Sequence, residues 1–451
     1  MFWLDAPDRP APSDPLVGPA EADLAIVGGG YMGLWAALLA KQRDPDRDVL
    51  LIEADTIAAH ASGRNGGFVD ASITHGIANG AAHFPGELSR LVRLGHENFD
   101  SLAATIAEFG VDARFEANGM LAVATEPWQL DGLREAVPLL RDHGETVDWL
   151  ERDELRVHVD SPTYLGGYLQ RTHQATVDPA RLAWGLADAA RSVGVRIHEG
   201  VRAERLDASA TGVRIHTDHG AARARRVVLA TNALSHLVRA TRRRVVPVWD
   251  YVVVTEPLSP AQRAAVGWSG GCGVGDAANQ FHYSRVTPDG RILWGGYDAI
   301  YYFGGDVSDR RAQRDATFDL LARHFFETFP QLDGLRFTHR WGGVIDTSSR
   351  FCVTFGTAHA GRVSFAVGYT GLGVAATRFG AQVALDLVDN PQSELCRLDF
   401  VRSKPFPFPP EPLRFGAIDL TRRAIGRADR RAGRRGPWLR LLDRFGVGFD
   451  S

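Results

Sequence analysis

Continuous apolar runs and stretches of helical periodicity alternate along the chain, beginning with residues 23–53. The apolar run 24–27 ends at a glycine-rich turn, a mostly apolar, helix-like stretch follows, and a second apolar run, 49–52, ends at Glu53. Strands buried on both faces have this continuous apolar character. The pattern therefore predicts a strand, a turn, a helix and a second strand, in the order of a β-α-β unit.

Periodicity and turn residues predict the elements that follow. Leucine, phenylalanine and isoleucine recur at helical spacing over 86–110, and the pair Asp178 and Pro179 supplies an N-cap and a first-turn proline for a helix to about residue 193. Residues 1–20, rich in proline and aspartate, are expected to form an extended arm. Further helices are expected over 308–329 and 373–388, and strands over 119–124, 167–170, 195–198, 213–216, 226–230, 245–255, 281–286, 291–295 and 363–367.

This order of elements predicts an α/β protein with two interleaved domains. A Rossmann-like dinucleotide domain is expected from 21–82, 160–244 and 340–392. A second domain, built on a mixed or antiparallel sheet, is expected from 83–159 and 245–339, with residues 288–290 forming a hairpin turn.

The turn after the first strand has the spacing of a dinucleotide fingerprint. Gly28 permits a tight turn, Gly30 lets a pyrophosphate approach the helix N-terminus, and Gly33 lets the helix pack closely on the strand. Tyr31 and Met32 lie within the same turn. Glu53 follows at the distance at which a carboxylate accepts hydrogen bonds from ribose hydroxyls. Together these features predict a dinucleotide site.

Two further glycine motifs favour FAD over NAD. Residues 60–67 place Arg64 and Asn65 among small residues, including Ser62, Gly66 and Gly67, which suits a backbone lying against a flat ring with donors at its edge. Gly371, Leu372, Gly373 and Val374 form a late strand-to-helix junction. The partial positive charge of such a helix N-terminus would stabilise the anionic edge of a reduced flavin.

Composition excludes several classes of protein. The net charge of −3 gives no general attraction to nucleic acid, and no apolar run is long enough to span a membrane. The N-terminus lacks the basic region of a secretory signal, and Cys272, Cys352 and Cys396 match no zinc spacing. We therefore expect a cytoplasmic protein with no metal centre and no nucleic-acid partner.

Motifs spread over nearly the whole chain resemble one family. They are residues 2–4, 28–33, 61–67, 177–179, 228–233, 340–343 with Asp346, 368–373 and 446–451. In this order they resemble the FAD-dependent oxidoreductases of the D-amino-acid oxidase/glycine oxidase group, and most of all its gamma-glutamylputrescine oxidase-like branch. The resemblance implies a glutathione-reductase-type FAD domain, a substrate domain whose sheet roofs the flavin, and cofactor contacts from Val201 and Thr231. It also implies oxidation of a C–N bond by hydride transfer to flavin N5.

The chain departs from its relatives at several positions. Similar sarcosine oxidases carry a lysine near flavin N5 and another after the late glycine motif, but here Lys41 and Lys404 are the only lysines and Ala375 occupies the second position. The electron acceptor is therefore left open between O2 and an electron carrier. Cys352 does not match the cysteine that binds flavin covalently in those enzymes, so we expect non-covalent FAD.

Aromatic and basic residues supply candidates for the substrate side. His60, Tyr251, Tyr297 and Trp341 are the residues we assign there, because aromatic rings attract an ammonium group and histidine can move a proton. Tyr301, Tyr302, His282 and four arginines, Arg285, Arg291, Arg340 and Arg350, are weaker candidates, each with a structural role as its alternative.

The C-terminal segment 393–451 is rich in arginine interspersed with apolar residues. This composition favours an amphipathic segment that docks weakly on a membrane or partner over a disordered tail, and a solvated face is the plainer alternative.

The function expected is FAD-dependent oxidation of a primary or secondary amine. An amino acid, an N-methyl amino acid or an aminophosphonate is the alternative substrate, because arginine can bind carboxylates and phosphonates. A flavin-binding subunit of a larger complex is an alternative of another class. A nicotinamide-dependent dehydrogenase is disfavoured by the motif at 371–373.

Overall fold

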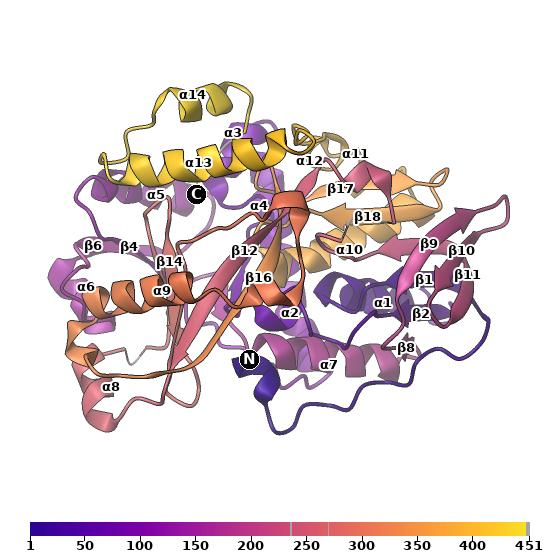
Figure 1. Cartoon of the computed structure of the whole chain (residues 1–451), viewed down its shortest axis with the longest axis horizontal. Helices are drawn as coiled ribbons and strands as arrows, with labels where there is room; N and C mark the ends of the chain where they lie inside the picture. Colours follow the sequence, from indigo (N-terminus) through magenta and orange to yellow (C-terminus); the bar gives the residue numbers. More distant parts are fainter. Residues whose placement is uncertain (235–236, 269, 448–451) are drawn as a thin grey trace.

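The computed structural model describes residues 1–234, 237–268 and 270–447, so the predicted motif at 446–451 extends outside the described residues. Two large sheets lie side by side, with the C-terminal helices α13 (Leu413–Asp429) and α14 (Pro437–Arg444) across the top in yellow (Figure 1). None of the described helices is long and apolar enough to cross a bilayer.

The first sheet has eight strands in the order β17-β18-β11-β1-β2-β8, with β10 paired to β11 and β9 paired to β10. Its central pairs β1·β11, β1·β2, β2·β8 and β11·β18 are parallel. The strands are β1 (Ala20–Val27), β2 (Val49–Ile52), β8 (Arg196–His198), β9 (Ala203–Ala208), β10 (Val213–Thr217), β11 (Gly220–Leu229), β17 (Thr354–Ala358) and β18 (Val363–Val367).

Alternate residues of β1 explain how this sheet is covered. Leu24 and Ile26 join the core formed with helices, whereas Ala25 and Val27 join a second core on the opposite face. Burial on both faces accounts for the continuous apolar run in the sequence. The helices packed here are α1 (Tyr31–Arg43), α4 (Leu88–Glu108), α7 (Pro179–Ser192) and α10 (Gly373–Asp389).

The second sheet has eight strands in the order β16-β12-β15-β14-β13-β4-β6-β5 and is mixed, because β13 and β4 run parallel while the other pairs are antiparallel. Helix α9 (Asp315–Thr328) packs on one face against Trp249, Tyr251 and Val253. The strands are β4 (Met120–Ala124), β5 (Val147–Glu151), β6 (Gly166–Gln170), β12 (Val245–Thr255), β13 (Gly273–Asp276), β14 (His282–Val286), β15 (Ile292–Gly296) and β16 (Phe337–Ser348).

Smaller elements join these layers. Strands β3 (Phe68–Asp70) and β7 (Gln174–Thr176) form a two-stranded sheet. The remaining α-helices are α2 (Ala61–Arg64), α3 (Ile77–His83), α5 (Gln129–Asp142), α6 (Arg152–His158), α8 (Pro260–Val266), α11 (Glu394–Arg397) and α12 (Asp399–Arg402). The 3-10 turns among the described residues are η1 (Phe2–Asp5), η2 (Arg239–Thr241), η3 (Phe303–Gly305), η4 (Asp309–Ala312) and η5 (Pro330–Leu332).

The mixed α/β architecture with two sheets confirms the predicted fold class, and Asp178 caps α7 by accepting a hydrogen bond from the Arg181 amide, as predicted. Two local predictions were wrong. The N-terminal arm is not extended throughout, because residues 2–5 form η1, which buries Trp3 and lets the Trp3 indole donate to the Asn65 carbonyl. The helix predicted at 308–329 begins only at Asp315, because Arg314 has an extended backbone.

Three segments pack differently from the predicted division of domains. Helix α4, placed by sequence in the second domain, packs on α10, where Asn98 Nδ2 donates to the Ala375 carbonyl at 2.9 Å. Strand β6 and residues 340–348 of β16, placed in the dinucleotide domain, belong to the second sheet. Hydrophobic periodicity identifies an element but not the partner on which it packs, which explains these errors.

Candidate active site

One cavity of about 870 Å³ runs from the β1–α1 turn, past the second sheet, to the C-terminal helices. Its volume lies in the upper part of the range of roughly 300–1,000 Å³ typical of ligand sites. Most of the residues predicted to bind the cofactor line it: Gly28, Gly30, Tyr31, Met32, Glu53, Ser62, Arg64, Asn65, Gly66, Val201, Thr231, Gly371, Leu372, Gly373 and Val374. The structure thus brings together segments that are far apart in sequence.

The β1–α1 turn has no room for larger side chains. Gly28 has a φ of +113°, and a Cβ there or at Gly33 would overlap a backbone carbonyl oxygen. Gly33 itself does not line the cavity, so its role is to allow α1 to approach the turn. Gly30 is the N-cap of α1 without a side-chain cap, and the Tyr31 amide donates to Ser62 Oγ at 2.9 Å. The helix N-terminus therefore opens onto the cavity, as an anion site requires.

The Glu53 carboxylate is fixed at the edge of the cavity. Its two oxygens accept hydrogen bonds from the amides of Gly29 at 2.6 Å and Asp55 at 2.9 Å. A carboxylate oxygen has two lone pairs, so both oxygens keep capacity for a further donor. This geometry fits the predicted contact to ribose hydroxyls.

The loop at 60–67 is ordered by its own polar groups. Asn65 Nδ2 donates to the carbonyls of Ala61 and Ser62, and Asn65 Oδ1 accepts from the Gly67 amide. The Asn65 side chain therefore holds the loop and does not present a free amide to a ring edge, contrary to our expectation. Gly67 does not line the cavity, because it packs against the Val177 carbonyl.

The N-terminus of α10 faces the cavity at the predicted late glycine motif. Gly371 has a φ of +93° and open space around its Cα, and Leu372 gives α10 no side-chain cap. The preceding turn is held by buried Asp346, which accepts from the amides of Gly368 at 2.5 Å and Tyr369 at 3.2 Å. Burial raises the pKa of Asp346 to about 7, although these backbone hydrogen bonds oppose the shift.

Two of the four residues assigned to the substrate side line the cavity, and two do not. His60 lines it at the start of α2, and Tyr297 lines it just after β15. Tyr251 instead points into the α9 core, where its hydroxyl contacts Tyr302 Oη and the Arg311 carbonyl, each at 2.9 Å. Trp341 is buried beneath the Arg64 carbonyl, to which its indole donates at 2.9 Å.

The weaker candidates also have other roles. Arg285 is buried and donates to the carbonyls of Gly67 and Val177, and Arg350 donates to Ser403 and Val353. Arg291 and Arg340 pair with Asp289 and Asp315. None of these arginines lines the cavity in the part of the chain that the structure describes, nor do Tyr301, Tyr302 and His282.

Sequence reasoning missed the residues that the second sheet presents to the cavity. Alternate positions of β12 line it, namely Val246, Val248, Asp250 and Val252. From neighbouring segments come Phe68, Met120, Phe281 and Tyr283. The sequence shows that residues 245–255 alternate between two faces of a strand. It does not show which of the two faces lines the cavity.

The C-terminal helices close this end of the cavity. Ile418, Thr421 and Ile425 of α13 and Trp438 and Leu442 of α14 line it. The helix pair is anchored by Asp429, whose carboxylate accepts hydrogen bonds from the amides of Asn279 and Gln280. This segment therefore packs on the body of the protein (Figure 1). Its docking to a membrane or partner stays a prediction.

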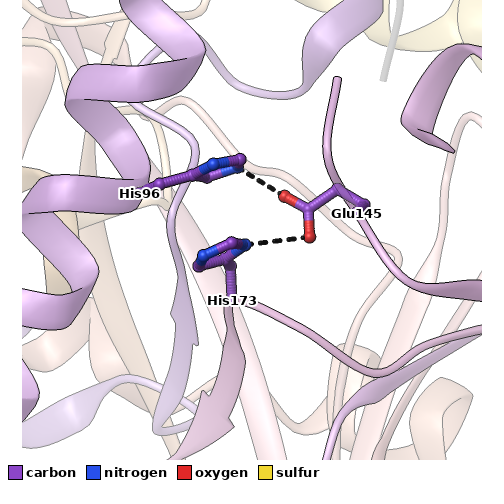
Figure 2. A group of neighbouring side chains, drawn as sticks. All are labelled: His96, Glu145 and His173. Carbon is purple, nitrogen blue, oxygen red and sulfur yellow. Dashed lines mark hydrogen bonds and ion pairs between the residues drawn. The ribbon is translucent and has the colours of Figure 1, made fainter. Parts of the chain in front are cut away.

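Outside the cavity, His96, Glu145 and His173 form a compact cluster (Figure 2). The two imidazole rings are stacked with their centroids 3.7 Å apart. The Glu145 carboxylate bridges them, with Oε1 at 2.7 Å from His96 Nε2 and Oε2 at 3.1 Å from His173 Nδ1. A metal ion prefers to lie in the plane of each imidazole, which stacked parallel rings do not offer. The cluster therefore joins α4 to two loops through hydrogen bonds.

Comparison with known families matches residues 23–387 to "FAD dependent oxidoreductase". The chain belongs to this family. It is therefore a FAD-dependent enzyme, and the predicted resemblance is confirmed. The uncapped termini of α1 and α10, the turn without room for a Cβ and the Glu53 carboxylate all fit the dinucleotide that family members bind.

Curated relatives of this family member match most of its length. It is 28% identical over 414 residues to the gamma-glutamylputrescine oxidoreductase of Escherichia coli, which covers 90% of this chain and 92% of the relative. It is 25% identical over 399 residues to a probable oxidoreductase, OrdL, of Haemophilus influenzae, which covers 86% and 87%. Among solved structures, glycine oxidase from Geobacillus kaustophilus shares the fold, with a TM-score of 0.71 at 21% identity over 85% of this chain and 99% of that one.

Proposed function

We propose that this chain oxidises a C–N bond of a primary or secondary amine. The observation that supports the proposal is that one continuous cavity joins the glycine turn of the first sheet to aromatic and carboxylate side chains of the second. Bound FAD supplies the acceptor for a hydride from the carbon next to the amine nitrogen, and the released imine hydrolyses to an aldehyde or keto product and an amine.

The cofactor would be held by residues of the first sheet. The N-terminus of α1 at Gly30 suits the pyrophosphate and Glu53 suits the ribose, with Val201 and Thr231 lining the same end. The N-terminus of α10 at Gly373 would stabilise negative charge on the reduced ring. No cysteine lines the cavity among the described residues, which supports non-covalent binding.

The rest of the cavity would position the amine and exclude water. Valines of β12 and isoleucines of α13 make the surroundings apolar, which favours the neutral amine from which a hydride can leave. Neither Lys41 nor Lys404 lines the cavity, so a lysine does not assist reaction with oxygen from this wall. We leave the acceptor as O2 or an electron carrier, and the three buried thiols suit a reducing cytoplasm.

Anaerobic reduction of the flavin tests the proposal. The holoenzyme is mixed with primary amines, N-methyl amino acids, D- and L-amino acids and aminophosphonates, and the loss of flavin absorption is followed before air is admitted. We expect amines to bleach the flavin fastest. Fast return of colour in air identifies an oxidase, and slow return identifies a dehydrogenase. If no compound bleaches the flavin, the proposal is wrong and a flavin-binding subunit explains the chain better.

A further inference from the structure

Asp250 is the acidic residue that β12 presents to the cavity. It shares the cavity-facing side of the strand with Val246, Val248 and Val252, while Tyr251 packs into the core on the other side. Trp249 belongs to that core and also borders the cavity. From β14, the Tyr283 hydroxyl donates to Asp250 Oδ2 at 2.5 Å. A carboxylate among valines is costly to bury, so its presence in the wall requires an explanation.

The Asp250 carboxylate is not paired with a cation of the described part of the chain. Among the described residues, no lysine, arginine or histidine forms an ion pair with Asp250. Tyr283 on β14 and Asp298 after the end of β15 are the titratable side chains that influence it. Burial raises the pKa of Asp250 to about 6, and the hydrogen bond from Tyr283 opposes that rise by favouring the charged carboxylate.

Three of the four arginines that line the cavity among the described residues are engaged elsewhere. Arg64 pairs with Asp309 at 2.9 Å, and Arg422 pairs with Asp298 and Asp419, each at 3.3 Å. Arg414 donates to backbone carbonyls, and Arg202 adjoins Val201 at the first-sheet end. Around Asp250 the described wall therefore offers a substrate carboxylate no unengaged guanidinium.

Aromatic rings complete the surroundings of Asp250. The Tyr283 ring meets the Phe68 ring edge-on, with centroids 5.5 Å apart, and its centroid lies 6.5 Å from that of Phe281. All three rings line the cavity, as does Tyr297. The negative faces of aromatic rings attract ammonium groups and repel carboxylates. Charge and ring chemistry at this end of the cavity thus point to the same class of ligand.

We propose that Asp250, oriented by Tyr283, pairs with an ammonium group of the substrate other than the reacting amine, and selects such cationic amines over amines that carry a carboxylate on the reacting carbon. This inference deepens the proposed amine oxidation and relies on it for the identity of the substrate.

A ligand that cannot be oxidised tests the site separately from turnover. Butyltrimethylammonium has no amine lone pair, and pentanoate matches its chain length with the opposite charge. Each is titrated into the holoenzyme and followed by perturbation of the flavin spectrum and by the melting temperature. We expect the cation to bind and pentanoate to bind weakly or not at all.

Asp250→Asn removes the charge at constant size, and Asp306→Asn is the control because Asp306 pairs with Arg310 and Arg311 outside the cavity. We expect Asp250→Asn to raise the Kd of butyltrimethylammonium roughly tenfold or more, and Asp306→Asn to leave it unchanged. A change of less than roughly threefold in Asp250→Asn, or tighter binding of pentanoate than of the cation by the unaltered enzyme, overturns the proposal.

Tyr283→Phe tests the proposed role of Asp250 if Asp250→Asn fails to fold. Loss of the hydrogen bond raises the pKa of Asp250 further, so the pH at which cation binding is half lost should move upward from about 6. An unchanged pH profile overturns the proposal. Failure of the proposed function looks different, because butyltrimethylammonium would still bind while no amine bleached the flavin.

Discussion

Glu145 allows a quantitative prediction, because it is nearly buried and bridges two histidines (Figure 2). Burial alone would raise its pKa, but hydrogen bonds from His173, His96 and Thr172 outweigh burial and lower the pKa from 4.5 to about 2. At about 1.4 kcal/mol per pH unit, this difference corresponds to about 3 kcal/mol of stability at neutral pH. The raised pKa of His173 reflects the same contacts and is not added to it.

The two pKa shifts define the pH range in which the cluster stabilises the fold. The contribution of Glu145 is present above pH 4.5 and is lost as the pH falls towards 2, because its folded pKa is depressed. The contribution of His173 is present below pH 6.5 and is lost as the pH rises through its raised folded pKa. The stabilisation should therefore be largest between about pH 4.5 and 6.5.

Glu145→Gln keeps the size of the side chain and removes its charge. We expect the melting temperature of the holoenzyme to fall by on the order of 4 °C near pH 5.5, and by less near pH 3 or pH 9. Hydrogen exchange should rise at residues 143–146 and 172–174. Glu135→Gln on the exposed face of α5 is the matched control and should change neither quantity. An equal loss at every pH, or no loss near pH 5.5, would refute the charge argument.

Three further predictions concern the cavity. Gly33→Ala should cost about 3 kcal/mol and abolish FAD retention, since the new Cβ overlaps the Gly28 carbonyl, whereas Gly86→Ala, in open space, should leave the flavin content of the purified protein unchanged. Deletion of the chain from Leu413 onward should open the cavity and make bound flavin accessible to iodide quenching; unchanged quenching would contradict closure by α13. Denaturation followed by filtration should release all flavin from the chain, because burial raises the pKa of the Cys352 thiol to about 11 and Cys352 does not line the cavity. Flavin retained on the denatured chain would show a covalent bond.

Local signals explain how much of this structure the sequence could predict. The turn from Gly28 to Gly33 and the cap at Asp178 depend on neighbouring residues, and both predictions were confirmed in their geometry. The pairing of Asp250 with Tyr283 depends on two strands with β15 between them, which no local pattern encodes. Tyr251 was wrongly chosen as a cavity residue, although its neighbour Asp250 does line the cavity. Successive side chains of a strand point to opposite faces of the sheet, so an error of one position along β12 places a side chain on the wrong face.

The position of the C-terminal helices also depends on contacts between distant segments, so no local pattern predicts it. Arginine-rich composition in 393–451 suggested a surface that binds elsewhere, but Ile418 and Ile425 of α13 line the cavity. The contacts that fix α13, from Asp429 to Asn279 and Gln280, join residues about 150 positions apart. The composition of a helix is a good guide to the side that faces water. It does not show where the other side packs.

Closure of the cavity by the last helices also orders events during synthesis of the protein. Both sheets and the β1–α1 turn are complete before α13 has been translated, and the chain folds as it emerges from the ribosome. Because α13 and α14 line the cavity, their final contacts form only after both sheets and the turn that would hold the cofactor have been synthesised.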